Sequence, residues 1–350
     1  MKIEQIVEQI TALARAHIAG RTELYDPAQP FPFDIWDEMG KAGMLGLGLP
    51  AEYGGGGVGY AGLVAVCAAF VEAGRNPGLA SAWLSHTLIG RLILGQSGSA
   101  AQKREYLPRL ASVARRDGDE WVLNGEKAWL TNGPIAGLYI VLAISEQVGE
   151  RKQFSAWLVP RDAPGLTQTD AGSIDFLRPT RHGGLALRDV RVPASSLLGE
   201  LGQAFETISK PLREVEDVLG LGMAQGGRAA LLDLLTAAIR DTDITPSEEQ
   251  FGLLGGLDAA QSALHILTTV LSEGLDQEPE YDPAAPLLAT RRLSRQFLTD
   301  FKNCLKSLPL PENTELLRLF RDLTKSGGLA SSVDRAKQEK LGKSLIRKMG

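Results

Sequence analysis

The spacing of apolar residues changes twice along the chain and separates three regions. In residues 1–112 apolar side chains recur at three- to four-residue intervals, which is the period of an amphipathic helix. In residues 113–200 the pattern changes to short apolar runs bounded by glycine and proline, which predicts strands. Helical spacing returns in residues 201–350. Because helices and strands are segregated, we expect an α+β protein with an N-terminal helical domain, a small middle β-domain and a C-terminal helical bundle over these three ranges.

Individual elements follow from the residue types within each region. Strands are expected at 138–144, 154–159 and 185–192, and the main helices at 61–73, 231–239, 257–275, 289–305 and 314–323. A β-hairpin is expected around Asn124-Gly125, because this dipeptide favours a two-residue type I′ turn and strand-forming residues flank it. This hairpin would present a tryptophan and a threonine, Trp129 and Thr131, on one face of its second strand.

Composition and charge narrow the class of protein. A chain of 350 residues with 44% apolar content can bury the core of two or three domains. A net charge of −5 and a pI near 5.6 argue against nucleic-acid binding. The four histidines and two cysteines are scattered, so we expect no metal site and no disulfide framework. No signal peptide or membrane-spanning run stands out, and we expect a cytoplasmic protein.

Several stretches carry short motifs in a recognisable order. They are Gly43-Met-Leu-Gly-Leu-Gly-Leu-Pro-Ala-Glu-Tyr-Gly-Gly55, Gln102-Lys-Arg-Glu-Tyr-Leu-Pro-Arg-Leu-Ala-Ser112, Asn124-Gly-Glu-Lys-Ala-Trp-Leu-Thr-Asn132, and Val190-Arg-Val-Pro193 followed by Gly202-Gln-Ala-Phe205. This set closely resembles the acyl-CoA dehydrogenase family, and the order of helical, β and helical regions resembles it too. The resemblance implies the acyl-CoA dehydrogenase fold, in which the middle domain is β-barrel-like.

The resemblance also implies a chemistry. In the family the Trp-x-Thr segment contacts the isoalloxazine ring of FAD, which assigns Trp129, Leu130 and Thr131 here as cofactor-binding residues. The implied activity is FAD-dependent α,β-oxidation of an acyl-CoA thioester, as in fatty acid metabolism, and the implied assembly is a homo-oligomer formed through the C-terminal helices. We expect Trp129 and Thr131 at the mouth of a cleft between the β-domain and those helices.

The chain departs from the family where the cofactor and the base are held. The family's Thr-Glu-Pro-x-x-Gly-Ser-Asp segment is missing, since Ser112 runs directly into Val113-Ala-Arg-Arg-Asp117. Glu248 stands where the family has an arginine for the FAD pyrophosphate, and a carboxylate there would repel it. No carboxylate occurs near Ala330, where most branches carry the base. We therefore expect FAD affinity to be weak or absent in the isolated chain.

Some branches of the family carry the base on the first helix after the β-domain. Asp217 is the best match in that region, followed by Glu216 and Glu214, and Asp334 is a more distant candidate. The competing interpretation is that these carboxylates form a solvated helix face. If none acts as the base, the chain would be a non-catalytic or half-site subunit that keeps the fold and forms a hetero-oligomer with a complete, related subunit.

Overall fold

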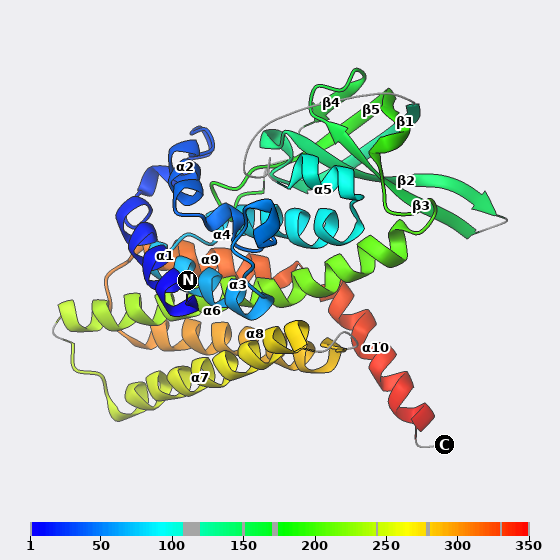
Figure 1. Cartoon of the computed structure of the whole chain (residues 1–350). Helices are drawn as coiled ribbons and strands as arrows, with labels where there is room; N and C mark the ends of the chain where they lie inside the picture. Colours follow the sequence, from blue (N-terminus) through cyan, green and yellow to red (C-terminus); the bar gives the residue numbers. More distant parts are fainter. Residues whose placement is uncertain are drawn as a thin grey trace. The chain divides into compact units, whose positions relative to one another are not determined.

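The computed structural model confirms the α+β class and the predicted order of helices, strands and helices (Figure 1). It describes residues 2–107, 120–148, 151–169, 174–242, 244–277, 281–329 and 331–348. The chain forms two compact units, and the division between them passes through two of the helices. Unit 1 comprises residues 1–21, 59–80 and 217–350, and unit 2 comprises residues 22–58 and 81–216. The three-domain division expected from the sequence stays a prediction.

The elements are numbered along the chain. The helices are α1 (Ile3–His17), α2 (Phe33–Lys41), α3 (Tyr60–Gly74), α4 (Pro77–Leu88), α5 (Ala100–Tyr106), α6 (Lys210–Asp241), α7 (Glu248–Gln277), α8 (Ala284–Ser307), α9 (Thr314–Gly328) and α10 (Ser331–Lys348). The strands are β1 (Glu120–Thr131), β2 (Leu138–Val148), β3 (Arg151–Pro160), β4 (Leu166–Thr169), β5 (His182–Pro193) and β6 (Leu197–Leu198). Every strand and main helix expected above is present, with longer bounds.

The β part of unit 2 consists of two three-stranded antiparallel sheets that share one apolar core. One sheet has the strand order β1-β5-β4 and the other has the order β2-β3-β6. Side chains from both sheets pack together in the core, among them Leu123, Val190, Val141, Trp157 and Val159. Alternating apolar positions of β-branched and aromatic residues produce this arrangement, because one face of each strand turns inward. The middle region is therefore barrel-like, as expected.

The predicted hairpin at Asn124-Gly125 is wrong, since β1 continues through this dipeptide as one strand. Residues on both sides of it pair with β5, and the register runs from Leu123 opposite Val190 to Gly125 opposite Leu187. The strands therefore form a β-bulge at this point. Gly125 has φ +140°, a conformation that favours glycine. The Asn124 side chain holds the bulge through Asp189, donating to the carboxylate at 3.0 Å and accepting from the backbone N–H at 2.8 Å. An Asn-Gly pair suits a bulge as well as a turn, and only the partner strand decides between them.

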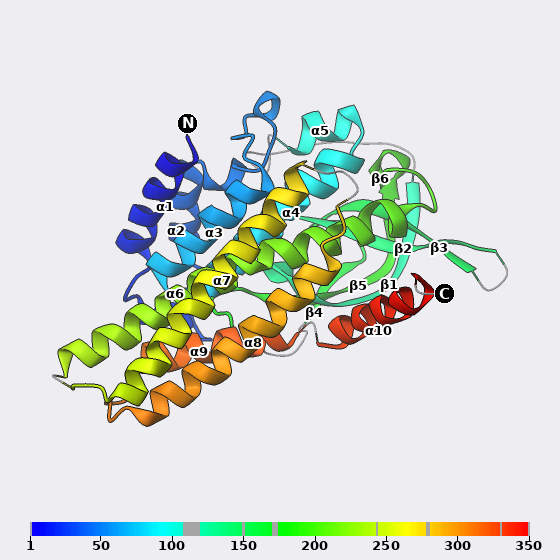
Figure 2. The same cartoon turned by 90° about the horizontal axis from the view of Figure 1, so that it is seen from below.

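Unit 1 is a helical bundle, whose helices α6, α7 and α8 run side by side (Figure 2). Apolar residues of α6, α7, α8 and α9 form its core, including Leu231, Leu235, Leu264, Phe297, Phe301 and Leu319. Helices α3 and α6 approach closely, because a Cβ on Gly226 would lie 2.1 Å from the Ala68 carbonyl oxygen. Where the structure describes the helices, none is long and apolar enough to cross a membrane.

Candidate functional site

Two of the three residues expected to bind the cofactor, Leu130 and Thr131, have side chains that the structure describes, and both lie at the end of β1. Leu130 packs against the shared β core, which fixes the strand end, and Thr131 follows as the last residue of the strand. The Thr131 side chain is half-buried. Its hydroxyl makes no hydrogen bond within the part of the chain that the structure describes. A hydroxyl held on a rigid strand with its hydrogen-bonding capacity unused can bind a ligand.

Asn132 fixes the turn that follows Thr131. Its backbone N–H donates to the Arg181 carbonyl at 2.7 Å, and its side-chain amide donates to the Ala82 carbonyl of α4 at 2.9 Å. Its φ of +61° is one that asparagine tolerates better than most residues. The remaining acceptor, Oδ1, is buried and has no partner among the described residues. The residue after Thr131 therefore carries a buried acceptor without a partner among the described residues.

The loop after β1 is held by Tyr139 of β2 and by Arg161, the residue that follows β3. The Tyr139 hydroxyl donates to the Gly133 carbonyl at 2.8 Å, and Arg161 donates to the carbonyls of Pro134 and Ala136 at 2.9 and 3.1 Å. Burial raises the pKa of Tyr139, which keeps its hydroxyl protonated as a donor. These contacts hold the position of the β1 end without using the Thr131 side chain.

His182 is a candidate residue that the sequence did not reveal. It is the first residue of β5 and pairs with Thr131 in the β1–β5 ladder. Directly opposed residues of an antiparallel pair project to the same face with Cβ atoms about 5 Å apart. Burial, and to a lesser extent the charge of Arg178, lowers the pKa of His182, so its imidazole is neutral at neutral pH. Only the strand register could have identified this residue, and one sequence does not define the register.

The remaining cofactor candidate, Trp129, has a side chain that lies outside the described residues. Its backbone belongs to β1, and the β1–β5 register shifts again between Lys127 and Leu130, so a second irregularity falls at this position. Bulges often lie next to functional sites because they redirect a side chain. The prediction that Trp129 and Thr131 lie together at a cleft mouth stays a prediction.

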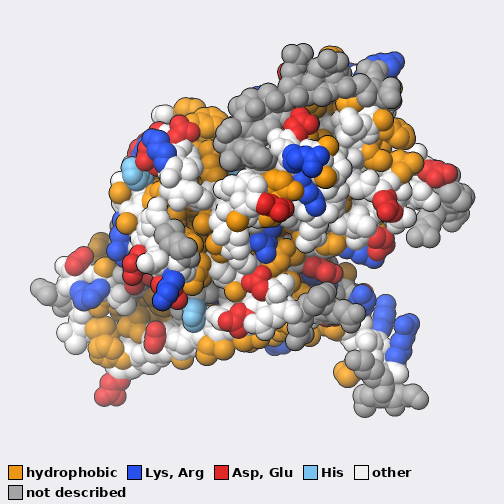
Figure 3. Space-filling model, viewed as in Figure 1, with side chains coloured by type: hydrophobic (Ala, Val, Ile, Leu, Met, Phe, Trp, Pro, Cys, Tyr) orange, Lys and Arg blue, Asp and Glu red, His pale blue; other side chains and the backbone are white. Residues whose placement is uncertain are grey.

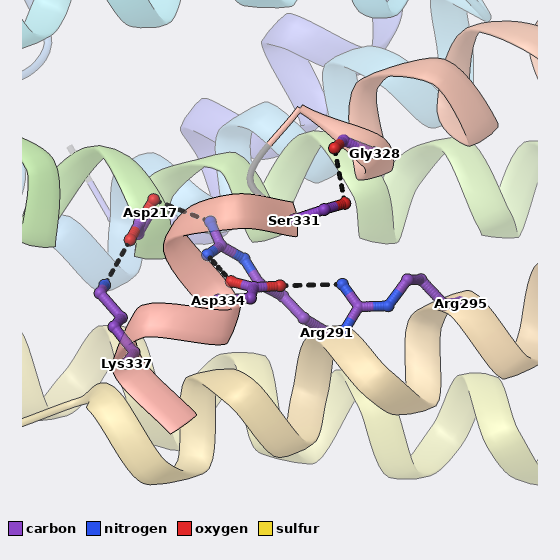
Figure 4. A network of polar contacts seen from close by, with 7 residues as sticks. All are labelled: Asp217, Arg291, Arg295, Gly328, Ser331, Asp334 and Lys337. Atoms are coloured by element: carbon purple, nitrogen blue, oxygen red, sulfur yellow. Dashed lines mark hydrogen bonds and ion pairs between the residues drawn. The ribbon is translucent and has the colours of Figure 1, made fainter. Parts of the chain in front are cut away.

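Asp217, the first candidate for the base, lies in a network of ion pairs (Figure 4). One carboxylate oxygen accepts from Arg291 of α8 at 2.7 Å, and the other accepts from Lys337 of α10 at 2.7 Å. Arg291 also binds Asp334 at 2.7 Å, and Arg295 binds the other oxygen of Asp334 at 2.9 Å. Asp217 and Asp334 are 13% and 4% exposed. This arrangement ties α6 and α10 to α8, which is a structural role for both carboxylates.

The other carboxylates singled out in the sequence have more solvent-exposed positions. Glu214 and Glu216 are both exposed on α6. Glu214 lies about one helical turn before Asp217, and Glu216 directly precedes it. Glu248 is the exposed first residue of α7. Residues 112–117, where the missing segment would begin, and Ala330 lie outside the described residues. No group of three or more potential metal ligands occurs in the part of the chain that the structure describes.

The residues at the end of β1 fit one part of a flavin site. Two consecutive residues, Thr131 and Asn132, carry a hydroxyl and an amide oxygen that have no partner among the described residues. A flavin ring bears both acceptors and donors for such groups. Glu248 does not fit a phosphate. These two groups therefore suit the ring of FAD, whereas Glu248 does not suit its pyrophosphate.

Two family models match the chain. The acyl-CoA dehydrogenase N-terminal domain matches residues 2–114, and the acyl-CoA dehydrogenase middle domain matches residues 96–190. A probable acyl-CoA dehydrogenase of Bacillus subtilis, YngJ, is 32% identical over 262 residues, which cover 66% of this chain and 68% of that protein. The mitochondrial isovaleryl-CoA dehydrogenase of Pongo abelii is 27% identical over 65% of this chain, and the match spans only 60% of its length.

Solved structures show the same fold at lower identity. The prolyl acyl carrier protein oxidase AnaB superimposes with a TM-score of 0.84 at 20% identity, covering 98% of both chains. Butyryl-CoA dehydrogenase from Megasphaera elsdenii superimposes with a TM-score of 0.82 at 18% identity, covering 99% of this chain and 98% of that one.

Proposed function

The chain belongs to the acyl-CoA dehydrogenase family of flavoprotein oxidoreductases, and from that premise we propose that it binds FAD at the end of β1 and oxidises an acyl-CoA thioester. The observation that supports this most strongly is the half-buried Thr131 side chain at the end of β1, whose hydroxyl makes no hydrogen bond to any described residue. A hydroxyl that the fold does not use can donate a hydrogen bond to a bound ligand.

Three consecutive residues at the end of β1 would each contribute to binding the isoalloxazine ring of FAD. Leu130 anchors the strand in the β core, and Asn132 holds the backbone turn through Arg181 and Ala82. The Thr131 hydroxyl between them would donate to the ligand. FAD, when bound, would supply the acceptor for the hydride that leaves the substrate β-carbon. The partly buried setting would exclude water and strengthen these hydrogen bonds.

The α-proton of the thioester needs a base within hydrogen-bonding reach. Asp217 could take this role only if Arg291 and Lys337 released it, because each of its oxygens is held by a cation at 2.7 Å. Glu216 and Glu214 are exposed and close to it along α6. We therefore propose Glu214 ahead of Asp217 if the base lies in this chain, and Glu216 remains a further candidate.

The engagement of Asp217 also supports a second candidate function. If Asp217 serves only to tie helices together, and the site lacks another base, the chain would be a half-site subunit in a hetero-oligomer with a complete relative. Such a subunit would keep the flavin-facing strand, which is why cofactor binding alone does not separate the two functions. Turnover by the isolated chain does.

The test measures reduction of an artificial electron acceptor by the purified chain with added FAD and a panel of thioesters. The relatives suggest the panel: butyryl-CoA, isovaleryl-CoA and a prolyl thioester of an acyl carrier protein. Replacing the base with an amide should reduce turnover by about 10²–10⁴-fold, so Glu216→Gln, Glu214→Gln and Asp217→Asn are compared. No turnover with any thioester, despite bound FAD, would contradict the enzymatic proposal and favour the half-site subunit.

We also propose a cytoplasmic location and a homo-oligomeric assembly for this chain. The two cysteines, Cys67 and Cys304, are both free and buried, which fits a reducing compartment such as the cytoplasm. Members of the family often form oligomers, and we propose the same for this chain as a homo-oligomer.

A further inference from the structure

Two arginines and a histidine lie close together where β5 begins. Arg178, Arg181 and His182 fall within five residues, and no aspartate or glutamate occurs between Phe176 and Arg188. This clustering is local, because the chain as a whole has a net charge of −5. Figure 3 shows acidic and basic side chains interspersed over most of the face that it draws. An anionic ligand at this strand end would therefore be attracted by the nearby side chains and not by the overall charge.

A tight turn before β5 fixes the backbone of Arg178. The Thr180 N–H donates to the Leu177 carbonyl at 3.0 Å, which makes Arg178 and Pro179 the two central residues of the turn. Leu177, Pro179 and Thr180 are buried, whereas the Arg178 side chain is half-buried. The turn is therefore anchored on both sides of Arg178, and only this side chain of the turn is partly accessible to a ligand.

The pairing of β1 with β5 brings this turn near the proposed ring contact. The Asn132 N–H donates to the Arg181 carbonyl at 2.7 Å, so these two residues face each other through a hydrogen bond. The neighbouring pair, Thr131 and His182, is then one without hydrogen bonds, in which the side chains of an antiparallel ladder approach most closely. The turn that carries Arg178 therefore leads directly into the strand position opposite Thr131.

Arg178 lies close enough to its two neighbours to act on them electrostatically. Burial, and after it the charge of Arg178, lowers the pKa of both Arg181 and His182. Arg181 donates to the Gln29 carbonyl, which carries no charge. Arg178 makes no hydrogen bond or ion pair with any described residue. No described carboxylate therefore balances the two arginines, and a bound anion would reduce the repulsion between them.

We propose that Arg178 binds the pyrophosphate of the ligand that contacts Thr131, either FAD or the CoA part of the thioester. This inference rests on the proposed function. A guanidinium presents several N–H donors in one plane, which suits phosphate oxygens. In FAD a ribityl chain separates the pyrophosphate from the ring, and residues 179–181 likewise separate Arg178 from the position opposite Thr131. For FAD, Arg178 would supply a cation that Glu248 does not.

Flavins with and without phosphate test the proposal for FAD. Binding of riboflavin, FMN and FAD to the purified chain is followed by the quenching of flavin fluorescence. Arg178→Gln is expected to weaken FAD and FMN binding by about 10- to 100-fold, because it removes a charged donor to the phosphate. Riboflavin has no phosphate, so its affinity should stay unchanged. Arg178→Lys keeps the charge without the planar donor group and should retain part of the affinity.

Two controls separate a phosphate contact from other effects. Arg188→Gln makes the same change of charge at an exposed position of β5 and should bind all three flavins like the wild type. Thr131→Val should weaken the binding of all three flavins alike, because it acts on the ring that they share. Circular dichroism reports on folding, and Arg178→Met is a second variant for the case in which Arg178→Gln does not fold.

Coenzyme A and pantetheine test the other source of the pyrophosphate. Calorimetric titration of the flavin-free protein measures the affinity for each, and pantetheine is the control because it lacks phosphate. If the CoA part of the thioester is the ligand of Arg178, Arg178→Gln should weaken CoA binding by about 10- to 100-fold. The affinities for pantetheine and for FAD should then stay unchanged.

Unchanged affinities for FAD, FMN and CoA in Arg178→Gln would overturn the proposal. An equal loss of riboflavin affinity, or an equal effect of Arg188→Gln, would overturn it as well. If flavin binding depends on Thr131 and not on Arg178, and CoA binding is unaffected, the proposed FAD site stands without this contact. A wild-type chain that binds no flavin would contradict the proposed FAD site, and the CoA titration would then decide the role of Arg178. Binding of neither flavin nor CoA would overturn both proposals.

Discussion

Asp217 lies between two cations that come from different helices. Its oxygens bind Arg291 and Lys337, and Arg291 continues the chain of contacts to Asp334. The sequence could locate three carboxylates on the helix after the β-domain, because that depends only on spacing along the chain. It could not show that one of them is paired, because the pairing cations are 74 and 120 residues away.

The first prediction concerns this network. Asp217→Asn leaves Arg291 and Lys337 without one of their anionic partners in a partly buried site, so we expect the variant to lose about 3 kcal/mol of unfolding free energy. Thermal unfolding followed by circular dichroism measures this loss. Asp233→Asn, at an exposed position of the same helix, is the control and should unfold like the wild type. An unchanged midpoint for Asp217→Asn would show that the network does not stabilise the bundle.

His86 carries a second prediction at the scale of one residue. Its Nε2 is buried without a described partner, and its ring meets Trp36 edge to face with centroids 5.6 Å apart. Burial lowers the pKa of His86 from 6.5 to about 4. Between these values the unfolded chain binds the proton and the folded chain does not, so stability falls as pH drops from about 6.5 to about 4.

The size of the His86 effect follows from the same shift. It corresponds to about 3 kcal/mol if the whole shift is realised. His86→Phe keeps a ring against Trp36 but removes the titrating group, so its unfolding midpoint should depend less on pH over this window. Parallel pH profiles of wild type and variant would mean that His86 titrates normally in the folded protein.

At the scale of elements, strand β1 shows where local signals are sufficient and where they fail. The strand-forming residues on both sides of Asn124-Gly125 were predicted correctly, since they reflect side-chain type. The connection between them was predicted wrongly. The same dipeptide suits a turn and a bulge, and only the pairing of both flanks with β5 shows that a bulge forms here. The same limit explains why His182 was missed. Its pairing with Thr131 is a property of the β1–β5 register.

The bulge gives a prediction about Gly125. Its φ of +140° is strained for any residue with a Cβ, although a Cβ there would meet no atom within 4 Å. Gly125→Ala should therefore destabilise the β region by about 1–3 kcal/mol through backbone strain alone. Gly137→Ala serves as the matched control, because Gly137 also has open space around its Cβ position but no positive φ. Chemical denaturation of the two variants compares them, and equal stability would contradict the assigned bulge geometry.

At the scale of the whole molecule, the order of helical, β and helical regions was predictable because hydrophobic period is a property of long stretches. Which apolar residues of α7 are buried was not predictable, because helical spacing shows that a helix has apolar residues and does not show which of them the bundle covers. The departures from the family, in contrast, could be found without a structure. The absence of the Thr-Glu-Pro segment and the glutamate at 248 are visible in the sequence alone.

The most direct test of the account is a titration of the purified chain with FAD, followed by the quenching of flavin fluorescence. We expect colourless protein after purification that binds added FAD with a dissociation constant in the micromolar range, since each missing charge-assisted hydrogen bond removes about 1.5–3 kcal/mol. Thr131→Val should weaken binding further, by about tenfold, because it removes one hydrogen bond and keeps the shape of the side chain. Stoichiometric FAD in the protein as purified, no binding at millimolar FAD, or identical affinity in Thr131→Val would contradict a flavin site at the end of β1.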